Sequence, residues 1–380
     1  MKNNVKRIIS LVIASIIFLI ITIMVGMYIG NSSFRLWIDK NVLKRNIAEE
    51  ELPTIDIEES KNTSVYAYGN YIAIIEDNTL SIYNKSTKKL ETIDVSITTP
   101  KFASNGNYLL VADEGKSSMY LIYNDSLQWE KEVEGKIAQV TVNKNGAVGV
   151  IITGTTYKSV VIMYDIDGNE NFKTYLSTTT AIDLAISEDN QYLSFIEINT
   201  SGTTIVSKVK TISVEKAKSS PNEAIINTYE TDSNVLLLRI KYYREKLVAY
   251  ADDAIHIYSN GNDEKIFTIS SDTSFVDINL NGYICIIREN SDKNSSNEYE
   301  LDMLNVESKK TNAYFVNDTV KAINCYGNIV AVNMGNEVDF INTNGWLVKK
   351  FTSFRNIKEI IVGDGVAAIV HKDSVEIIDL

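Results

Sequence analysis

The chain has 380 residues, 44% of them hydrophobic, which is enough to bury a large core, and its three prolines and eighteen glycines are too few for a disordered chain. The net charge is −12, and residues 1–45 hold seven basic side chains and one acidic one, so the remainder carries −18. A domain that acidic binds nucleic acid or anionic lipid poorly, which excludes both as partners of the main body of the chain.

The first predicted element is a membrane-spanning helix at residues 8–30. Ile8–Gly30 contains 23 residues and no Asp, Glu, Lys or Arg. At about 1.5 Å per residue, a helix of this length crosses a hydrocarbon core of roughly 30 Å. A cleaved signal peptide has a shorter apolar core of about 7–15 residues and a small-x-small cleavage site, and Gly30-Asn31-Ser32 is a poor site of that kind. We therefore expect an uncleaved anchor.

The orientation of this anchor follows from the length of its flanks as well as from their charge. Basic residues lie on both sides of the run, at Lys2, Lys6 and Arg7 before it and at Arg35, Lys40, Lys44 and Arg45 after it. The positive-inside rule is nearly balanced, but a long domain crosses the membrane largely regardless of its charge. We expect residues 1–7 to be a cytoplasmic tail and the domain behind the anchor to be extracytoplasmic.

Residues 31–52 are predicted to form a juxtamembrane helix or stalk. Leu36, Leu43 and Ile47 have helical spacing between Phe34 and Glu50, and Pro53 ends the segment. A helix at the lipid surface and a solvated stalk both fit this pattern.

From residue 53 to residue 380 the sequence repeats a turn followed by a short apolar strand, at intervals of roughly 40 residues. The turns contain Gly, Asn or Asp in most units because tight hairpins require a positive φ. They fall at Gly69, Gly106, Gly146, Asp189-Asn190, Arg244, Gly282, Gly327 and Gly365.

Each of these strands is followed by two further strands, and four strands per unit are typical of a β-propeller blade. A third strand with alternating apolar residues comes next, for example at Met119–Tyr123 and Val160–Tyr164, and a more polar fourth strand follows, as at Leu127–Val133. We count eight blades, and seven remain possible if one unit is divided wrongly, the unit with an insert near Val214–Asn222 being the weakest. The last unit lacks its outer strand, which we expect Thr54–Glu58 to supply, thereby closing the ring without a free edge.

This layout resembles quinoprotein-like and WD40-like propellers in general. More closely, it is similar to an uncharacterised family of Firmicute proteins with one N-terminal anchor and an exported propeller, a domain of unknown function. The resemblance covers the whole chain and implies an all-β fold, but it implies no activity. The Trp-Asp ending of WD40 blades is absent, and Trp37, Trp129 and Trp346 are too few for the Trp-docked ring of quinoprotein alcohol dehydrogenases.

The search for catalytic or cofactor-binding residues yields none. His256 and His371 lie on different units, and the sequence has no nucleophile elbow, phosphate-binding Gly loop or zinc signature. Asp165-x-Asp167-Gly168-Asn169-x-Asn171 has oxygen ligands at alternate positions, as Ca²⁺ prefers, but its Gly is fourth rather than sixth, so we interpret it as a turn. We therefore expect no catalytic, cofactor-binding or metal-binding residues.

Two further residue classes are assigned to packing. Cys285 and Cys325 lie in apolar strands and are expected to be buried thiols, although one disulfide between them remains possible in an exported chain. Tyr83, Tyr123, Tyr164 and Tyr258 all end the third strand of their units, which predicts packing between blades rather than ligand stacking.

These observations favour a non-catalytic binding or scaffolding protein on the outer face of the cell membrane. Its partners would be the membrane, through the anchor, and an envelope protein or a cell-wall polymer, with no nucleic acid. The alternatives are an enzyme that acts on cell-wall glycan or peptide with carboxylates at the mouth of the central channel, and a sensor that signals through its anchor. The sequence identifies neither the ligand nor the oligomeric state.

Overall fold

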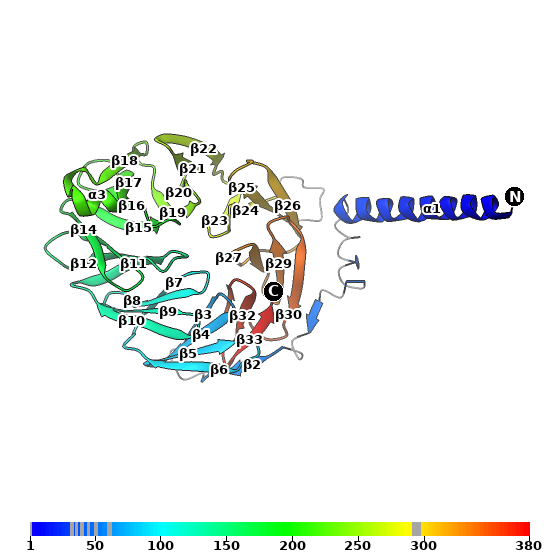
Figure 1. Cartoon of the computed structure of the whole chain (residues 1–380), viewed down its shortest axis with the longest axis horizontal. Helices are drawn as coiled ribbons and strands as arrows, with labels where there is room; N and C mark the ends of the chain where they lie inside the picture. Colours follow the sequence, from blue (N-terminus) through cyan, green and yellow to red (C-terminus); the bar gives the residue numbers. More distant parts are fainter. Residues whose placement is uncertain are drawn as a thin grey trace.

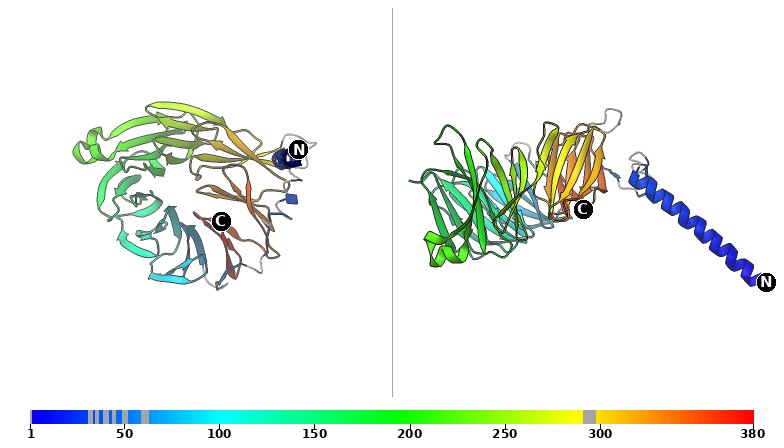
Figure 2. Two further views of the ribbon diagram at one scale, coloured as in Figure 1. Left: turned by 45° about the vertical axis from the view of Figure 1, so that its right-hand side comes forward. Right: turned by 90° about the horizontal axis from the view of Figure 1, so that it is seen from above.

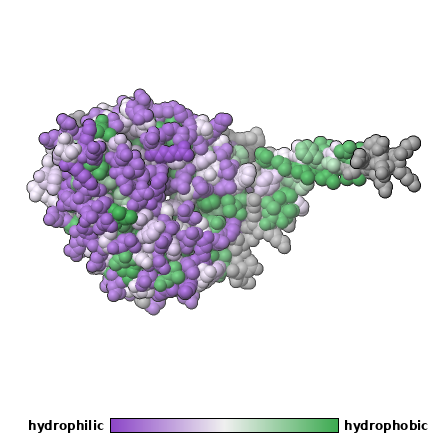
Figure 3. Space-filling model, viewed as in Figure 1, coloured by the Kyte–Doolittle hydropathy of each residue, from purple (hydrophilic) through white to green (hydrophobic). Residues whose placement is uncertain are grey.

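The computed structural model describes residues 2–30, 34, 37–38, 42–43, 46–48, 52–58, 63–290 and 298–380. A single long helix, α1 (Lys2–Gly30), precedes a ring of β-sheets (Figure 1). Its Leu11–Ile29 part has a mean hydropathy of 2.7 and is long and apolar enough to cross a membrane. Figure 2 shows the ring edge-on with α1 extending away from it, and Figure 3 shows hydrophobic residues gathered along α1 beside a mostly hydrophilic ring face.

The described residues form eight sheets, each with four antiparallel strands and one with an added fifth strand, which confirms eight blades rather than seven. The first strands lie nearest the axis, where most neighbouring ones contact each other. They are β3 (Thr63–Tyr68), β7 (Pro100–Asn105), β11 (Lys136–Val142), β15 (Thr180–Ile186), β19 (Leu237–Tyr243), β23 (Thr273–Asp277), β27 (Ala322–Tyr326) and β31 (Glu359–Val362). The second strands are β4 (Tyr71–Glu76), β8 (Tyr108–Asp113), β12 (Val148–Thr153), β16 (Tyr192–Asn199), β20 (Lys246–Ala251), β24 (Tyr283–Glu289), β28 (Ile329–Asn333) and β32 (Val366–Val370).

The third and fourth strands complete each blade outward. The third strands are β5 (Thr79–Asn84), β9 (Ser118–Tyr123), β13 (Ser159–Tyr164), β17 (Val206–Ser213), β21 (Ala254–Ser259), β25 (Tyr299–Asn305), β29 (Glu337–Asn342) and β33 (Ser374–Asp379). The fourth strands are β6 (Lys89–Asp94), β10 (Ser126–Glu132), β14 (Glu170–Leu176), β18 (Ile225–Glu230), β22 (Asn262–Thr268), β26 (Thr311–Val316), β30 (Leu347–Thr352) and β2 (Thr54–Asp56). We number the blades 1 to 8 from the one that contains β3.

The core consists of eight hydrophobic clusters, each shared by two neighbouring blades. The second strands are apolar throughout because alternate residues face opposite neighbours. In β4, for example, Ile72 and Ile74 pack against blade 8, whereas Ala73 and Ile75 pack against blade 2. A sheet covered on both faces needs such continuous apolar runs.

The turns between first and second strands confirm the expected backbone conformation. Seven of the eight contain a residue with φ between 47° and 78°, namely Gly69, Gly106, Gly146, Asn190, Arg244, Gly282 and Gly327. Arg244 departs from the expected Gly or Asn, with a φ of 53°. In blade 4 the expected insert is α3 (Val214–Ser219) with the short 3-10 helix η2 (Pro221–Glu223), and Val214 and Ala217 pack on the core shared by blades 3 and 4.

The ring closes as the sequence predicts. β2 pairs antiparallel with β33, so Thr54 lies opposite Glu376 and Asp56 opposite Ser374. Ile55 is only 6% exposed and belongs to the cluster shared by blades 8 and 1. A segment from the start of the ring therefore becomes the outer strand of its last blade.

The predicted juxtamembrane helix is wrong at its C-terminal end. Asn46–Ala48 forms a strand, β1, which pairs parallel with β30 as a fifth strand of blade 7. The helical pattern is overridden here because the exposed edge of β30 offers unpaired backbone groups to the passing chain. Most of the rest of residues 31–52 lies outside the described residues.

The closing strand gives a stability prediction. Ile55→Ala removes a buried side chain from the closure, so we expect the free energy of unfolding to fall by about 2–4 kcal/mol in chemical denaturation. Ile225→Ala is the matched control, because Ile225 is 45% exposed on the fourth strand of blade 4 and its loss costs roughly 0.5 kcal/mol or less. Equal effects of the two substitutions would show that the closing strand contributes nothing special.

Candidate functional site

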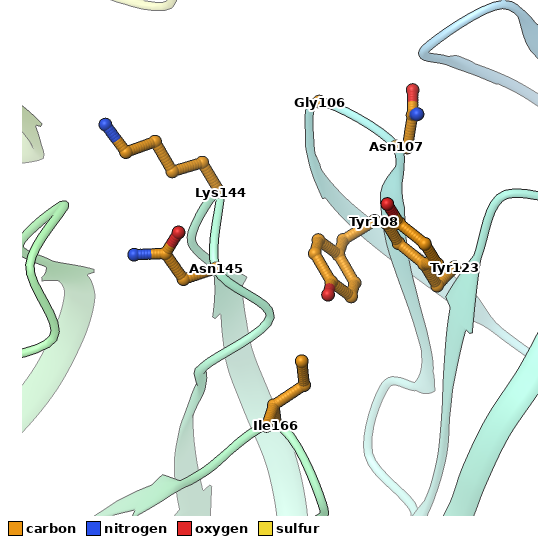
Figure 4. Close-up of a pocket in the computed structure, with 7 residues that line it drawn as sticks. All are labelled: Gly106, Asn107, Tyr108, Tyr123, Lys144, Asn145 and Ile166. Carbon is orange, nitrogen blue, oxygen red and sulfur yellow. The ribbon is translucent and has the colours of Figure 1, made fainter.

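A pocket of about 500 Å³ lies between blades 2 and 3, at the end of the ring that carries the turns between first and second strands. We call this end the turn face and the cavity the blade 2–3 pocket. Figure 4 shows its lining, with the two tyrosines side by side and the turn that carries Lys144 opposite them. The lining residues are Gly106, Asn107, Tyr108, Tyr123, Lys144, Asn145 and Ile166.

Two tyrosines of blade 2 form an aromatic platform in the pocket. The ring centroids of Tyr108 and Tyr123 are 4.5 Å apart at an angle of 37°. Tyr108 is 9% exposed and Tyr123 is 38% exposed. Burial and the neighbouring Tyr123 raise the pKa of Tyr108, so its phenol stays protonated at neutral pH. Gly146 allows this packing, because a Cβ there would lie 2.8 Å from the Tyr108 ring.

Ile166 reaches the pocket from the turn that the sequence offered as a calcium candidate. Asp165 Oδ1 accepts hydrogen bonds from the backbone N–H groups of Asp167 at 3.0 Å and Asn169 at 2.8 Å. The Trp129 indole N–H donates to the Ile166 carbonyl at 2.9 Å. The expected turn is therefore observed, and its Asp165 side chain hydrogen-bonds to the backbone of the same turn. The turn places Ile166, which is 43% exposed, beside the tyrosines.

Polar groups of blade 3 form the opposite wall. Lys144 pairs with the Glu188 carboxylate of blade 4, and Asn145 Nδ2 donates to the Glu188 carbonyl at 2.6 Å. Although burial opposes it, the contact with Lys144 lowers the pKa of Glu188, so the carboxylate stays ionised. The Lys144 charge is thus compensated, and Figure 4 shows the Lys144 and Asn145 side chains pointing away from the tyrosines. They point toward their partner Glu188 in blade 4.

The same carboxylate begins a chain of ion pairs along the turn face. Glu188 Oε1 accepts from the Arg244 backbone N–H at 3.1 Å, and the Arg244 guanidinium lies 3.5 Å from Glu307. Lys246 lies 3.1 Å from the same Glu307. These contacts connect the turns of blades 3 to 6 in one polar network.

A second cluster of polar side chains, which we call the axial cluster, lies on the first strands near the axis. The first strands of blades 3 to 6 each contain a β-bulge against the second strand, at Ile137/Gln139, Ala181/Asp183, Leu237/Arg239 and Thr273/Phe275. A bulge changes the direction of the side chains that follow it. After two of these bulges, Gln139 Nε2 donates to Asp183 Oδ1 at 3.1 Å, and the Ile240 N–H donates to Asp183 Oδ2 at 2.8 Å.

Burial perturbs the charged groups of this axial cluster. It raises the pKa of Asp183 to about 6, in spite of the hydrogen bonds and the nearby Arg239. Burial likewise raises the pKa of Asp277, which accepts from the Asn279 N–H at 2.6 Å. It lowers the pKa of Lys241 to about 8, while Lys241 Nζ donates to the Asn279 carbonyl at 2.6 Å. Asp183 and Asp277 are the carboxylates near the axis that come into question for the enzyme alternative, and both are engaged by backbone N–H groups.

The histidines and cysteines lie apart from the pocket. His256 Nδ1 is 2.7 Å from Asp263 in blade 5, and His371 is buried in blade 8 with Nε2 3.2 Å from Glu376. Cys285 and Cys325 are buried free thiols in the cluster shared by blades 6 and 7. Among the residues that the structure describes, no three His, Cys, Asp or Glu side chains come together as a metal site.

The tyrosine prediction holds for three residues and fails for one. Tyr83, Tyr164 and Tyr258 pack on the core shared with the preceding blade. Tyr123 instead lies in the blade 2–3 pocket, facing the following blade, because Ile122 occupies the position that packs on the preceding one. A register shift of one residue places a strand side chain on the opposite face of the sheet. Counting the residues from the first turn of each blade to its tyrosine would have revealed the difference, since this number is odd only for Tyr123.

Comparisons with known proteins establish the family and the fold. A model described as "Family of unknown function (DUF5711)" matches residues 44–380, and no curated protein matches the chain. The chain is similar to the solved structure of BamB from Moraxella catarrhalis, with a TM-score of 0.51, 11% identity, and coverage of 86% of this chain and 96% of that one. It is also similar to the C-terminal WD40 domain of Sif2, with a TM-score of 0.56, 11% identity, and coverage of 86% and 98%. At these identities the likeness concerns the fold alone.

The buried carboxylates predict a dependence of stability on pH. Burial raises the pKa of Asp339 to about 6, from about 3.9 in an unfolded chain. Between these values the folded state binds more protons than the unfolded state, so the contribution of Asp339 to stability falls as the pH rises from 4 to 6, by roughly 2 kcal/mol. We expect Asp339→Asn to remove this part of the slope in denaturation measured from pH 4 to pH 7. Asp167→Asn, at an exposed turn, is the control and should keep the slope of the unaltered chain; the same slope in both variants would refute the assignment.

Proposed function

The chain belongs to this family of unknown function, and we propose that it is a non-catalytic binding or scaffolding protein on the outer face of the cell membrane. In this proposal residues 1–7 are cytoplasmic, residues 8–30 span the membrane, residues 31–52 link the anchor to the ring, and residues 53–380 form the exported propeller. The partner is an envelope protein or a cell-wall polymer.

The observation that carries the proposal is the blade 2–3 pocket on a rigid face. Its exposed tyrosine, exposed isoleucine and amide side chains are groups that bind ligands, and contacts of Lys144 and Asn145 with Glu188 hold the turn on its blade 3 side. A preformed pocket reduces the cost of loop ordering on binding, which suits a scaffold. The fold that the chain shares with BamB and the WD40 domain is compatible with this role.

The second candidate is an enzyme that acts on cell-wall glycan or peptide through Asp183 and Asp277. A carboxyl with a pKa near 6 is suited to proton transfer, and that observation favours the idea. It ranks second because both carboxylates accept backbone hydrogen bonds, which a structural role explains. Release of soluble fragments from purified cell wall by the purified chain would reverse this ranking.

The orientation is tested by labelling a single introduced cysteine. Asn107→Cys places an exposed thiol on the turn face, whereas Cys285 and Cys325 are buried and should stay silent. We expect a membrane-impermeant maleimide to label this variant in intact cells and to leave the unaltered chain unlabelled. Labelling that requires cell lysis would contradict an extracytoplasmic propeller.

The partner is tested by photo-crosslinking in cells. A photoreactive residue at Asn145, on the turn face, should give a discrete adduct with an envelope protein or wall polymer. The same residue at Lys116, on an exposed turn at the opposite end of blade 2, should not. Absence of any adduct from Asn145, or equal adducts from both positions, would count against binding at the turn face.

A further inference from the structure

We propose that the blade 2–3 pocket binds a saccharide, with a sugar ring packed on Tyr123 and a hydroxyl group hydrogen-bonded to Asn145. The inference rests on the proposed function, because it specifies the ligand class of the same surface. It is carried by three independent features of the pocket, namely a break in the repeat, the geometry of the tyrosines and the balance of charge.

Tyr123 breaks the repeat because it lies on the opposite face of its blade from the other tyrosines that end third strands. Tyr164 and Tyr258, which end the third strands of blades 3 and 5, are 4% and 3% exposed and pack on the preceding blade. Tyr123 faces the following blade and keeps 38% of its surface exposed. Because Ile122 already fills the place on the preceding interface, Tyr123 packs instead on Tyr108 and stays partly exposed. An aromatic residue left partly exposed where the repeat is broken indicates function.

The geometry gives Tyr123 a fixed orientation. Tyr108 supports it from within blade 2, with ring centroids 4.5 Å apart, and Tyr108 is itself held against Gly146. Ile166 adds an exposed apolar surface on the other side of the cavity, from a turn fixed by Trp129. A flat aromatic face beside an aliphatic side chain suits the C–H face of a pyranose ring, which is apolar while its edge carries hydroxyl groups.

The polar groups of the pocket favour a neutral ligand with many hydroxyl groups. Lys144 is neutralised by Glu188, so the pocket has no strong preference for an anion. Asn145 is exposed, and its amide carries both donors and an acceptor. Asn145 uses one donor on the Glu188 carbonyl, and among the described residues no group donates to its Oδ1. A sugar hydroxyl both donates and accepts, so it matches this amide.

The pocket lies at the surface, where one segment of a longer glycan has access to it. Its lining residues lie on surface turns and strand ends of two neighbouring blades. A volume of about 500 Å³ is within the range of small-molecule sites. One or more sugar rings of a polymer therefore fit into the pocket, while the rest of the polymer chain runs over the turn face.

The test is titration calorimetry of the full chain in lipid nanodiscs, with the β-1,4-linked tetramer of N-acetylglucosamine and with soluble glycan strands from cell wall as probes. We expect at least one probe to bind and Tyr123→Ala to weaken its binding about tenfold, since losing one aromatic contact costs about 1.4 kcal/mol. Tyr175→Ala is the matched control, because Tyr175 is 53% exposed and also pairs with a tyrosine, Tyr157 at 4.7 Å, but lies outside the pocket lining. Its binding should equal that of the unaltered chain.

A second variant keeps the test valid if Tyr123→Ala does not fold. Asn145→Ala removes an exposed amide and should weaken binding by about threefold to tenfold. Failure of every probe to bind, or affinities unchanged in both Tyr123→Ala and Asn145→Ala, would overturn the saccharide assignment. If a protein is crosslinked through Asn145 but no glycan binds, the saccharide assignment is overturned and the proposed binding function stands. If neither a crosslink nor glycan binding is found, both proposals are overturned.

Discussion

The fold depends on closing a ring of sheets that are apolar on both faces. Each of the eight core clusters is shared by two blades, so a blade without a neighbour would expose a face that holds residues such as Ile72 and Ile74. The pairing of β2 with β33 joins the start of the ring to its end, and Ile55 extends the core of the last interface. Because closure removes the free edge, it protects against strand addition by other chains as well as against unfolding.

Closure also determines where function can reside. A stacked ring has a face of turns, and in this chain the turns of blades 3 to 6 are joined by ion pairs and a backbone hydrogen bond through Glu188 and Glu307. The first strands of the same four blades contain bulges, and Asp183, Lys241 and Asp277 lie on three of these strands. The apolar contacts between blades therefore repeat regularly around the ring, whereas the turns and first strands of blades 3 to 6 depart from the repeat. Such departures are where specificity for a ligand is encoded.

The sequence predicts the architecture well, because that architecture follows from local rules. Gly106 and Gly146 mark turns that need a positive φ, and the missing outer strand of the last unit points to Thr54–Glu58. The pocket is not predicted, because its two walls, Tyr123 and Ile166, meet only when blades 2 and 3 stack. The strand at Asn46–Ala48 is missed for a similar reason, since a neighbouring edge rather than local propensity determines it. The turn at Asp165 is predicted correctly, but its role in placing Ile166 depends on Trp129 of another blade.

The central claim, that the chain closes its ring through β2, is tested most directly by a designed disulfide. Asp56 and Ser374 are register partners, and directly opposed strand residues have Cα atoms at a distance that a disulfide can bridge. The account predicts that the double variant Asp56→Cys with Ser374→Cys forms an intramolecular crosslink under mild oxidation of the folded full-length chain, detected by a shift in electrophoretic mobility. Asp56→Cys with Thr352→Cys, on the fourth strand of blade 7, should give none. A missing crosslink in the first pair, or equal crosslinking in both, would contradict closure by this strand.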